Sequence, residues 1–327
     1  MSEHFYIRKE YMEAQHTALS QKSLQSLAET RSENTIGAYQ SDWDDFCDWC
    51  RYHREEAFPA RPSTIVNYIN DLADNAKIST IRRRISAISE NFNAAGLSSS
   101  NPCREWIVRE ALTGLARQKG ALQKGKTPLY IEDMQKITEI IDVSRLSGLR
   151  DRAVLLLGFM GAFRRSELSG LNAEDVAFFP QGLVVTITHS KTDQESQGQQ
   201  VGIPYLPDSP LCPVRALKSW LSAAGIHEGP LFRSVLKNNR PSPNRLSDKS
   251  INLLIKKYAE AIGLDPELYG AHSLRHGFAT SAALCGVEER IIMKQTRHRS
   301  VEMVRHYINE AGLFINNPIS LMFQNKR

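Results

Sequence analysis

A short basic segment near the middle of the chain most constrains how this sequence can fold. The stretch LARQKGALQKGK (residues 115–126) contains four cations and two glycines but no acidic residue, and Pro128 stands two positions beyond it. Glycine-rich polar segments of this kind are typical of linkers rather than of packed elements. A chain of 327 residues also exceeds the usual size of one hydrophobic core. We therefore expect two domains, residues 1–115 and 128–327, joined by a linker at 116–127.

The charge of this linker has two explanations. A linker that crosses DNA would set its cations against phosphates, whereas a solvated tether would tolerate the same charge. The net charge of +5 gives weak support to an anionic partner. The linker cations that we consider as DNA contacts are Arg117, Lys119, Lys124 and Lys126.

Residues before the linker show helical periodicity throughout. Of four expected helices, one begins near Ser32, a second has Ser63 at its N-cap, a third ends at Gly96 and a fourth occupies residues 104–118. The third helix has isoleucines on one side and three successive arginines over much of the rest. A basic helix face can enter a DNA major groove, but an ordinary solvated face has the same pattern. These arginines are Arg82, Arg83 and Arg84.

A C-x-x-C pair at Cys47 and Cys50 raises the question of metal or redox chemistry. The two cysteines follow Trp43 and Phe46 at the spacing i, i+3, i+4 and i+7, which is the buried stripe of a helix. No second C-x-x-C pair in the sequence completes a four-ligand zinc site. We therefore expect packing, and no metal, at this pair.

Residues after the linker combine helical periodicity with one segment of strand-like alternation. In GLVVTITHSKTDQESQGQQVGIPY (residues 182–205), β-branched and apolar residues alternate before and after a polar stretch. This pattern predicts two strands joined by a polar turn. Helical segments are expected at residues 131–143, 150–163, 213–225 and 249–263. The expected fold class is mainly α with a small antiparallel β-sheet, an α+β fold.

Nothing in the sequence predicts export or membrane insertion. No apolar run reaches the roughly 18–20 residues that span a bilayer. The N-terminal stretch MSEHFYIRKEYMEAQ is charged throughout, unlike a signal peptide. Five cysteines fit a reducing compartment. We expect an intracellular, cytoplasmic protein.

Two pairs of residues carry chemistry at a spacing of three, which places each pair on one helix face. His272 and Arg275 lie in the first turn of an expected helix, where free N–H groups favour an anion and a guanidinium matches phosphate oxygens. Arg164 and Glu167 follow an apolar helix, and the carboxylate can orient the guanidinium. His272 and His276 also form H-x-x-x-H, but Ser rather than Glu follows His272, so we do not expect zinc.

Tyr307 is the candidate nucleophile, nine positions after His298 in a basic turn. A tyrosine with the ordinary pKa of about 10 needs roughly 4 kcal/mol of activation at pH 7. Two arginines and a histidine that accepts the proton offer help of that order, since one preorganised donor contributes about 10²–10³ in rate. The product is a phosphotyrosyl ester. That ester keeps the energy of the broken phosphodiester, so rejoining needs no ATP, and the sequence has no G-x-x-x-x-G-K-[ST] loop.

Lys191 lies at the expected turn between the two strands, where it can give a proton to a leaving oxygen. Each of these residues, taken alone, also has an ordinary structural interpretation. A lone tyrosine is often half-buried in a helix, a lone histidine often lies in a surface turn, and a hairpin lysine is usually solvated. Their order and spacing together favour a functional site.

These motifs closely resemble those of the tyrosine recombinase (phage integrase) family. AFRRSEL resembles the first arginine box of the family, HSLRHGFATSAALCGV its H-x-x-R box, and TRHRSVEMVRHYI the segment that ends in the nucleophile. The resemblance extends from about Thr127 onward. The region before the linker is similar, with weaker motifs, to the core-binding domain of Cre-like members.

The resemblance implies a role for each site residue and no metal or other cofactor. The implied roles are nucleophile for Tyr307, phosphate clamps for Arg164 and Arg275, general acid to the 5′-oxygen for Lys191, base or proton shuttle for His272, phosphate hydrogen-bond donor for His298, and supporting acid for Glu167.

One position departs from the family pattern. The family usually has Leu-Gly-His where this chain has Thr296, Arg297 and His298. Arg297 thus replaces a small turn residue, and we expect the turn either to differ or to touch DNA. Some Cre-like members carry Trp at the position of His298, so the role of that residue is replaceable.

The function implied by the resemblance is site-specific DNA recombination. Two domains would form a C-shaped clamp on double-stranded DNA, and a homotetramer would hold two sites, each with paired inverted half-sites. Strand exchange would pass through a 3′-phosphotyrosyl bond and a Holliday junction, in the cytoplasm at the nucleoid. The apolar tail NEAGLFINNPISLMFQNKR (residues 309–327) would insert into a neighbouring protomer. The alternatives are a type IB topoisomerase, a telomere resolvase and a non-catalytic DNA-binding repressor.

Overall fold

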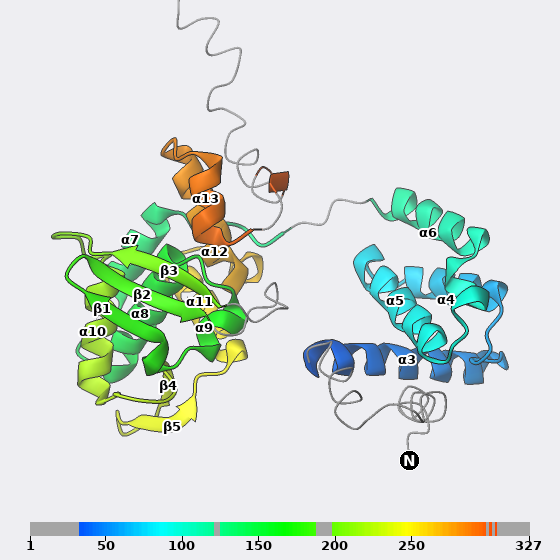
Figure 1. Cartoon of the computed structure of the whole chain (residues 1–327), viewed down its shortest axis with the longest axis horizontal. Helices are drawn as coiled ribbons and strands as arrows, with labels where there is room; N and C mark the ends of the chain where they lie inside the picture. Colours follow the sequence, from blue (N-terminus) through cyan, green and yellow to red (C-terminus); the bar gives the residue numbers. More distant parts are fainter. Residues whose placement is uncertain (1–32, 121–124, 188–197, 299–300, 303–304, 306–327) are drawn as a thin grey trace, which may run out of the picture. The chain divides into compact units, whose positions relative to one another are not determined.

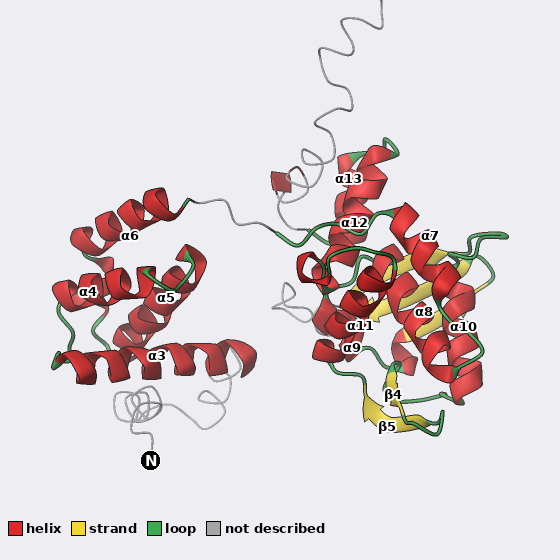
Figure 2. Cartoon of the chain, turned by 180° about the vertical axis from the view of Figure 1, so that it is seen from behind, coloured by secondary structure: helices red, strands yellow, loops and turns green. Residues whose placement is uncertain are grey.

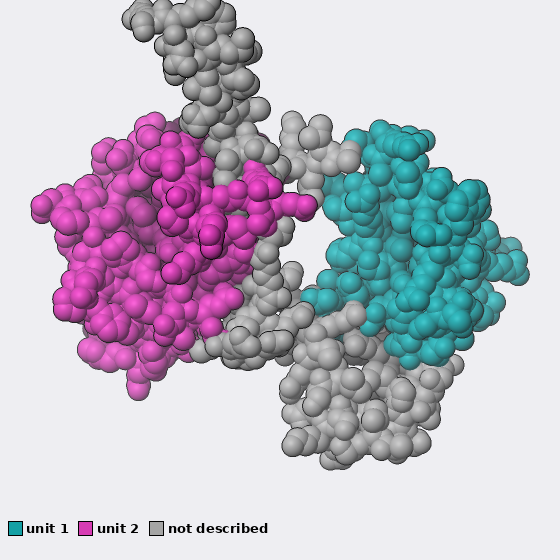
Figure 3. Space-filling view, turned by 45° about the horizontal axis from the view of Figure 1, so that its top comes forward, with its two compact units in different colours: residues 1–124 teal, residues 125–327 magenta. Residues whose placement is uncertain are grey.

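The computed structural model describes residues 33–120, 125–187, 198–298, 301–302 and 305. The chain divides into two compact units, Met1–Lys124 and Gly125–Arg327, which Figure 3 colours separately. Each unit has its own hydrophobic core. The point of division falls inside the segment that we expected to be a linker. The fold class is as expected, because helices dominate the described residues and the strands are few, short and antiparallel.

The described part of unit 1 is helical (Figures 1 and 2). Its elements are α3 (Glu33–His53), α4 (Pro62–Ala73), α5 (Ile78–Ala94), the short 3₁₀ turns η1 (Ser98–Ser100) and η2 (Pro102–Arg104), and α6 (Trp106–Lys119). The stripe expected on α3 is confirmed, because Trp43, Phe46, Cys47 and Cys50 are all buried in the core of the unit. Burial raises the pKa of the Cys47 and Cys50 thiols to about 12 in each case.

Three helix boundaries in unit 1 refine the sequence predictions. Helix α4 begins one residue before Ser63, with Pro62 in its first turn and Arg61 as N-cap, because the fixed φ of proline suits that position. Gly96 follows the C-cap of α5 with φ 76°, and Leu97 N–H donates to Phe92 O at 2.9 Å beyond it. Helix α6 continues to Lys119, so the first residues of the expected linker are helical, and Gly120 follows with φ 72°.

The arginines of α5 hold that helix against α3. The Arg83 guanidinium pairs with the buried carboxylate of Asp42 at 2.7 Å. Arg84 pairs with Asp45 of α3 and donates to the Tyr68 hydroxyl at 2.9 Å. Arg84 therefore contributes to packing between helices, whereas Arg82 is exposed. The cause is a pair of aspartates on the facing helix, which a basic helix face alone does not reveal.

Unit 2 packs helices against one face of a three-stranded sheet (Figures 1 and 2). The strands are β1 (Val176–Phe179), β2 (Gly182–Ile187) and β3 (Gln199–Pro204), in the order β1-β2-β3. Both pairings are antiparallel, and Val185 lies opposite Val201. A separate hairpin joins β4 (Arg233–Val235) to β5 (Pro241–Arg245). The two predicted strands are confirmed as β2 and β3, while β1, β4 and β5 were not predicted.

Helix α8 lies at the centre of unit 2. The helices of the unit are α7 (Ile131–Ile140), α8 (Leu146–Met160), α9 (Arg165–Gly170), α10 (Pro213–Ala224), α11 (Asp248–Ala261), α12 (Ala271–Leu284) and α13 (Glu289–Thr296), with 3₁₀ turns η3 (Ala173–Asp175) and η4 (Pro266–Leu268). Residues Ala153–Phe159 of α8 are buried all round, as expected for a helix with apolar residues on every side. The end of α8 therefore has a fixed position from which the site is built.

The chain enters unit 2 along α12. Thr127 N–H donates to Leu268 O at 3.0 Å, and Leu129 N–H donates to Ser273 O at 3.1 Å. Gly277 permits this approach, because a Cβ at that position would lie 1.8 Å from Leu129 O. Lys126 is anchored here as well, with its Nζ 2.5 Å from Glu267 O. Residues 126–129 are thus held against η4 and α12.

Within the described residues, no helix combines the length and the apolar character needed to cross a bilayer.

Candidate active site

The first part of the site is the turn between α8 and α9. Ala162 follows the C-cap of α8 with φ 45°, a left-handed conformation that is uncommon outside glycine. Gly161 precedes it because a Cβ there would lie 2.1 Å from the Phe163 ring. This tight turn delivers Arg164 to the N-cap of α9.

Arg164 and Glu167 form the local pair that their spacing predicts. The Arg164 N–H donates to Glu167 Oε2 at 2.9 Å, and the Arg164 guanidinium donates to Oε1 at 2.6 Å. The Glu167 side chain is 1% exposed. Burial would raise the pKa of Glu167, but Arg297 and then Arg164 outweigh it and lower that pKa to about 2. Glu167 is therefore an ionised carboxylate that holds guanidinium groups.

Helix α12 supplies the second part of the site. Arg275 is 2% exposed, and its guanidinium donates to Ala162 O at 2.7 Å. His272, one turn earlier, is exposed on the surface of α12. Partial desolvation of the ring, followed by the positive charges of His276, Arg275 and Arg164, lowers the pKa of His272. The imidazole is thus kept neutral near pH 7 and is able to accept a proton.

His298 lies in the turn after α13, in contact with Arg275. Arg275 Nε donates to His298 Nε2 at 3.3 Å. The Thr296 hydroxyl donates to Ile292 O at 2.7 Å, so it is an acceptor for His298 Nδ1–H at 2.8 Å. Burial, followed by Arg275 and Arg164, lowers the pKa of His298 to about 3. The ring is therefore neutral, with the proton assigned to Nδ1 by its partners.

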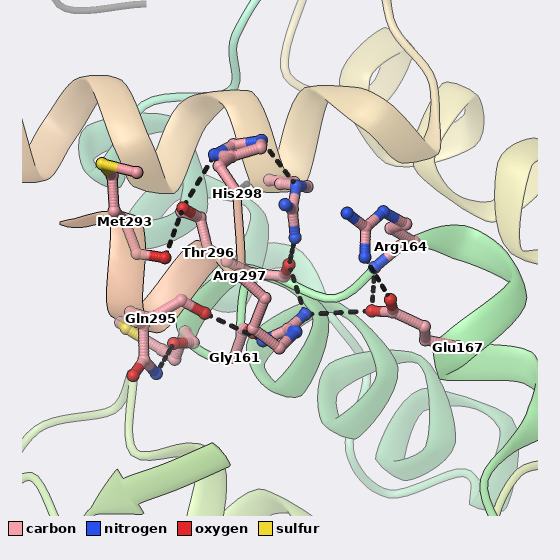
Figure 4. Close-up of polar contacts among 11 residues, drawn as sticks. Gly161, Arg164, Glu167, Met293, Gln295, Thr296, Arg297 and His298 are labelled. Atoms are coloured by element: carbon pink, nitrogen blue, oxygen red, sulfur yellow. Dashed lines mark hydrogen bonds and ion pairs between the residues drawn. The ribbon is translucent and has the colours of Figure 1, made fainter. Parts of the chain in front are cut away.

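Arg297, which we considered as a DNA contact, is buried in this site. Its side chain is 5% exposed, and its guanidinium pairs with Glu167 Oε2 at 2.9 Å (Figure 4). The same guanidinium donates to Gly161 O and Ala162 O, both at 2.9 Å. It also lies 5.1 Å from the centre of the Phe163 ring. The backbone of Arg297 has φ 56°, a left-handed conformation that glycine adopts more readily.

Side chains from the end of α13 and from α12 cap the last carbonyls of α8. Gln295 Nε2 donates to Met160 O at 3.0 Å, Arg297 donates to Gly161 O, and both Arg275 and Arg297 donate to Ala162 O. These carbonyls lack partners within the helix, and the negative end of the helix dipole favours cations. Sequence reasoning missed this use of Gln295 and Arg297, although the basic residue in place of the usual glycine was a visible signal.

The structure brings together five of the predicted site residues. Arg164, Glu167, His272, Arg275 and His298 surround one another through the contacts and charge interactions described above. Lys191, Tyr307 and the linker residue Lys124 lie outside the described residues. Arg117 and Lys119 are exposed on α6 of unit 1.

His276 is a further residue whose use the sequence did not predict. Its Nδ1 lies 3.1 Å from Lys126 O, so it contacts the incoming strand that is seated on α12. Among the residues that the structure describes, no group of three or more His, Cys, Asp or Glu side chains is arranged to hold a metal ion.

Two family patterns cover most of the chain. The phage integrase family matches residues 129–312, and the phage integrase N-terminal SAM-like domain matches residues 16–95. An integrase/recombinase xerD homologue of Selenomonas ruminantium is 48% identical over 306 residues, which cover 93% of this chain and 90% of that protein. The tyrosine recombinase XerC of Thermodesulfovibrio yellowstonii is 28% identical and covers 84% of this chain and 85% of its own length.

Solved structures share the fold. XerH recombinase in a post-cleavage complex with its palindromic difH substrate has a TM-score of 0.56 at 17% identity, covering 79% of this chain and 73% of that one. The Tn1549 transposon integrase in complex with a circular intermediate DNA has a TM-score of 0.57 at 16% identity, covering 81% and 85%. The family match to more than half of the chain and the 48% identical relative carry the assignment. The chain belongs to the phage integrase family of tyrosine recombinases, and it is a site-specific DNA recombinase.

Proposed function

We propose that this recombinase cuts and rejoins duplex DNA through a 3′-phosphotyrosyl bond to Tyr307. The observation that carries the proposal is the cluster of Arg164, Arg275 and His298 around one position, with Arg275 held by a main-chain carbonyl and by an imidazole. Cations fixed in this way suit a phosphate whose negative charge increases in the transition state.

The proposed cleavage step is a displacement at the phosphorus atom. The Tyr307 oxygen attacks the phosphorus, and the bond to the 5′-oxygen breaks. The tyrosine proton passes to His272, whose lowered pKa keeps it a neutral acceptor. Lys191 gives a proton to the 5′-oxygen, which leaves as a hydroxyl. Attack by the hydroxyl of the partner duplex reverses the step and releases Tyr307.

His298 needs one adjustment before it donates to a phosphate. In the DNA-free site its Nε2 accepts from Arg275 Nε. A phosphate that takes over this arginine donor would free Nε2, and the imidazole could then bind a proton beside the dianionic phosphorane. We therefore propose that His298 changes from acceptor to donor when DNA enters.

Arg164 and Arg275 supply the positive charge that the phosphate needs, so we propose that cleavage requires neither a metal nor a nucleotide. The phosphotyrosyl ester retains the energy of the broken bond. Two rounds of exchange on two duplexes would form and resolve a Holliday junction at the nucleoid. A homotetramer on two sites, each with paired inverted half-sites, would carry out these rounds.

The first experiment tests the nucleophile. Purified protein is incubated with a pool of nicked genomic duplexes, and the covalently attached DNA is recovered after denaturation and sequenced to define the site. Tyr307→Phe should bind that site and form no adduct, because only the attacking oxygen is removed. Tyr205→Phe is the matched control and should form the adduct normally. Adduct formed by Tyr307→Phe would place the nucleophile elsewhere.

Two additions to this assay test the remaining chemistry. Adduct formation should continue at an unchanged rate in excess EDTA, and loss that magnesium or zinc restores would overturn the metal-free proposal. Supplying a second duplex with a free 5′-hydroxyl should give exchanged strands. Relaxation or resealing of one duplex without exchange would instead favour a type IB topoisomerase or a telomere resolvase.

An apolar groove on unit 2 supports the proposed tail exchange. The groove has a volume of about 600 Å³ and lies between the end of α8, β3, α12 and α13. Its lining includes Met160, Ile203, Phe278 and Ile291. The tail at residues 309–327 lies outside the described residues, but its sequence has seven large apolar side chains, which are Leu313, Phe314, Ile315, Ile319, Leu321, Met322 and Phe323. We propose that the groove receives this tail from a second copy of the chain.

Truncation after Asn316 tests the exchange. The shortened protein should bind one half-site nearly as well as the full chain, but it should lose cooperative pairing on two half-sites, as measured by gel-shift titration. Ile291→Asp, which charges the groove, should have the same effect. Undiminished cooperativity would overturn the exchange, and unfolding of the truncated chain would show that the tail packs on its own unit.

A further inference from the structure

We propose that Arg297 is a positioning residue for strand cleavage, which fixes Glu167 and the end of α8 so that Arg164 and Arg275 meet the phosphate correctly. The inference rests on the proposed function, because it names a residue that serves the same site. In this proposal Arg297 acts from within the protein and not on the DNA, since its side chain is 5% exposed.

The contacts of Arg297 reach both phosphate-binding arginines through shared acceptors. Glu167 accepts from Arg297 through Oε2 at 2.9 Å and from the Arg164 guanidinium through Oε1 at 2.6 Å. Ala162 O accepts from Arg297 at 2.9 Å and from Arg275 at 2.7 Å. The Arg297 guanidinium therefore shares one acceptor with Arg164 and another with Arg275. Its planar fork suits two acceptors better than a single ammonium would.

The same residue fixes the turn that carries His298. Arg297 donates to Gln295 O at 2.8 Å within its own turn and to Gly161 O across to α8 (Figure 4). Its neighbour His298 bonds to Thr296 on one side and Arg275 on the other. Movement of the Arg297 side chain would thus displace Arg164, Arg275 and His298.

The backbone gives independent support. Arg297 has φ 56°, a conformation in which glycine is favoured and a side chain carries a steric cost. The chain thus carries an arginine at a position whose backbone favours glycine, and the side-chain contacts offset that cost.

The proposal predicts that affinity and rate separate. Removing a buried side chain that sets geometry should leave the binding of half-site DNA within about twofold. Small misplacement of reacting groups can reduce a rate by about 10²-fold. We therefore expect Arg297→Gly and Arg297→Ala each to lower the single-turnover rate of adduct formation by about 10–100-fold. The glycine variant should be the more stable of the two, because it relieves the backbone.

The experiment uses the full-length protein and the nicked site recovered with the wild type. Half-site dissociation constants, single-turnover adduct rates and thermal unfolding are measured for Arg297→Gly, Arg297→Ala and Arg297→Lys. The lysine variant should recover part of the rate, because it keeps the charge but not the fork. Arg150→Met is the matched control, since it removes another shielded arginine that pairs with a buried carboxylate, Asp151 at 2.6 Å. It should leave the rate unchanged.

A double variant tests whether Arg297 acts through Glu167. If it does, Glu167→Gln combined with Arg297→Gly should be about as slow as the slower single variant. Multiplicative losses, a wild-type rate in Arg297→Gly, or equal losses of rate and affinity would each overturn the proposal. Unfolding of both the glycine and the lysine variants at the assay temperature would make Arg297 a folding residue and overturn it too. If the wild type forms no adduct, the proposed function itself fails.

Discussion

The two units of this chain use ion-paired arginines in opposite ways. In unit 1, Arg83 and Arg84 of α5 face Asp42 and Asp45 of α3, so each cation has a carboxylate. In unit 2, Arg164 and Arg297 share one buried carboxylate, Glu167. Arg275 donates to a main-chain carbonyl and an imidazole, and Arg297 donates to main-chain carbonyls as well.

This difference distinguishes structural cations from those prepared for a ligand. A balanced cluster is satisfied within the protein and joins two helices. A cluster with more guanidinium groups than carboxylates leaves positive charge for an anion, and carbonyls at a helix end hold those groups without neutralising them. We infer that the excess cations of unit 2 are matched by DNA phosphate.

The largest expected effect comes from replacing one cation in each cluster. Arg275→Lys keeps the charge but loses the planar fork, so the adduct rate should fall by about 10²–10³-fold. Arg84→Lys should reduce thermal stability and leave the rate per folded molecule unchanged. Rate measurements on the recovered nicked site, with unfolding curves for both variants, check the contrast. A similar loss of rate in both variants would break the comparison.

Proton delivery should be separable from the charge cluster. Lys191→Ala should slow cleavage of an ordinary strand by about 10²-fold. A strand with sulfur in place of the 5′-bridging oxygen should be cut at nearly the wild-type rate, because sulfur leaves without a proton. Arg275→Lys should slow both strands. Equal slowing of the two substrates by Lys191→Ala would make Lys191 a phosphate contact instead.

Lowering the pH should change the stability contributed by Glu167 and by Asp42 in opposite directions. The pKa of Glu167 is lowered to about 2, so its stabilisation is present above pH 4.5 and is lost as pH falls toward 2. Burial raises the pKa of Asp42 against the opposing charges of Arg83 and Arg84, so protonation of Asp42 favours the folded state. The advantage of wild type over Glu167→Gln should therefore shrink between pH 5 and pH 3, by about 3 kcal/mol at most.

The matched variant Asp42→Asn gives the other half of this test. The free energy of unfolding of Asp42→Asn, measured relative to wild type, should decrease as pH falls through the acid range. The reason is that the Asp42 carboxyl of wild type then becomes protonated and gains the neutral state that the variant already has. Urea unfolding of the three proteins at several pH values measures both trends. Parallel trends for the two variants would contradict the opposite signs.

The sequence predicts the parts of the site that depend on local spacing. Arg164 with Glu167 and His272 with Arg275 follow from a separation of three residues on a helix. The role of Arg297 does not, because its acceptors Gly161 and Ala162 are 136 and 135 positions away and meet it only through packing. The packing contact of Arg84 was not predicted for a related reason, since its partner Asp45 lies 39 positions earlier.

The fold was predictable to a similar extent. The strands β2 and β3 have β-branched alternation, and both were expected from it. Strand β1 is four residues long and mostly exposed, and β5 contains two prolines, so neither has a clear alternating pattern. The extension of α6 to Lys119 reflects good helix formers that a charge-based view of the linker overlooked.

The segment 126–129, which packs on α12, affects how genes of this kind can exchange parts of their sequence. Residues 126–129 are bonded to η4 and to the helix that carries His272 and Arg275, and a Cβ at Gly277 would collide with Leu129 O. They therefore belong to the catalytic module, although they precede its first helix. A foreign N-terminal module spliced upstream of Gly125 would leave this helix supported, whereas a splice after Leu129 would remove its support. Gene crossovers that survive selection should therefore fall upstream of Gly125 rather than after Leu129.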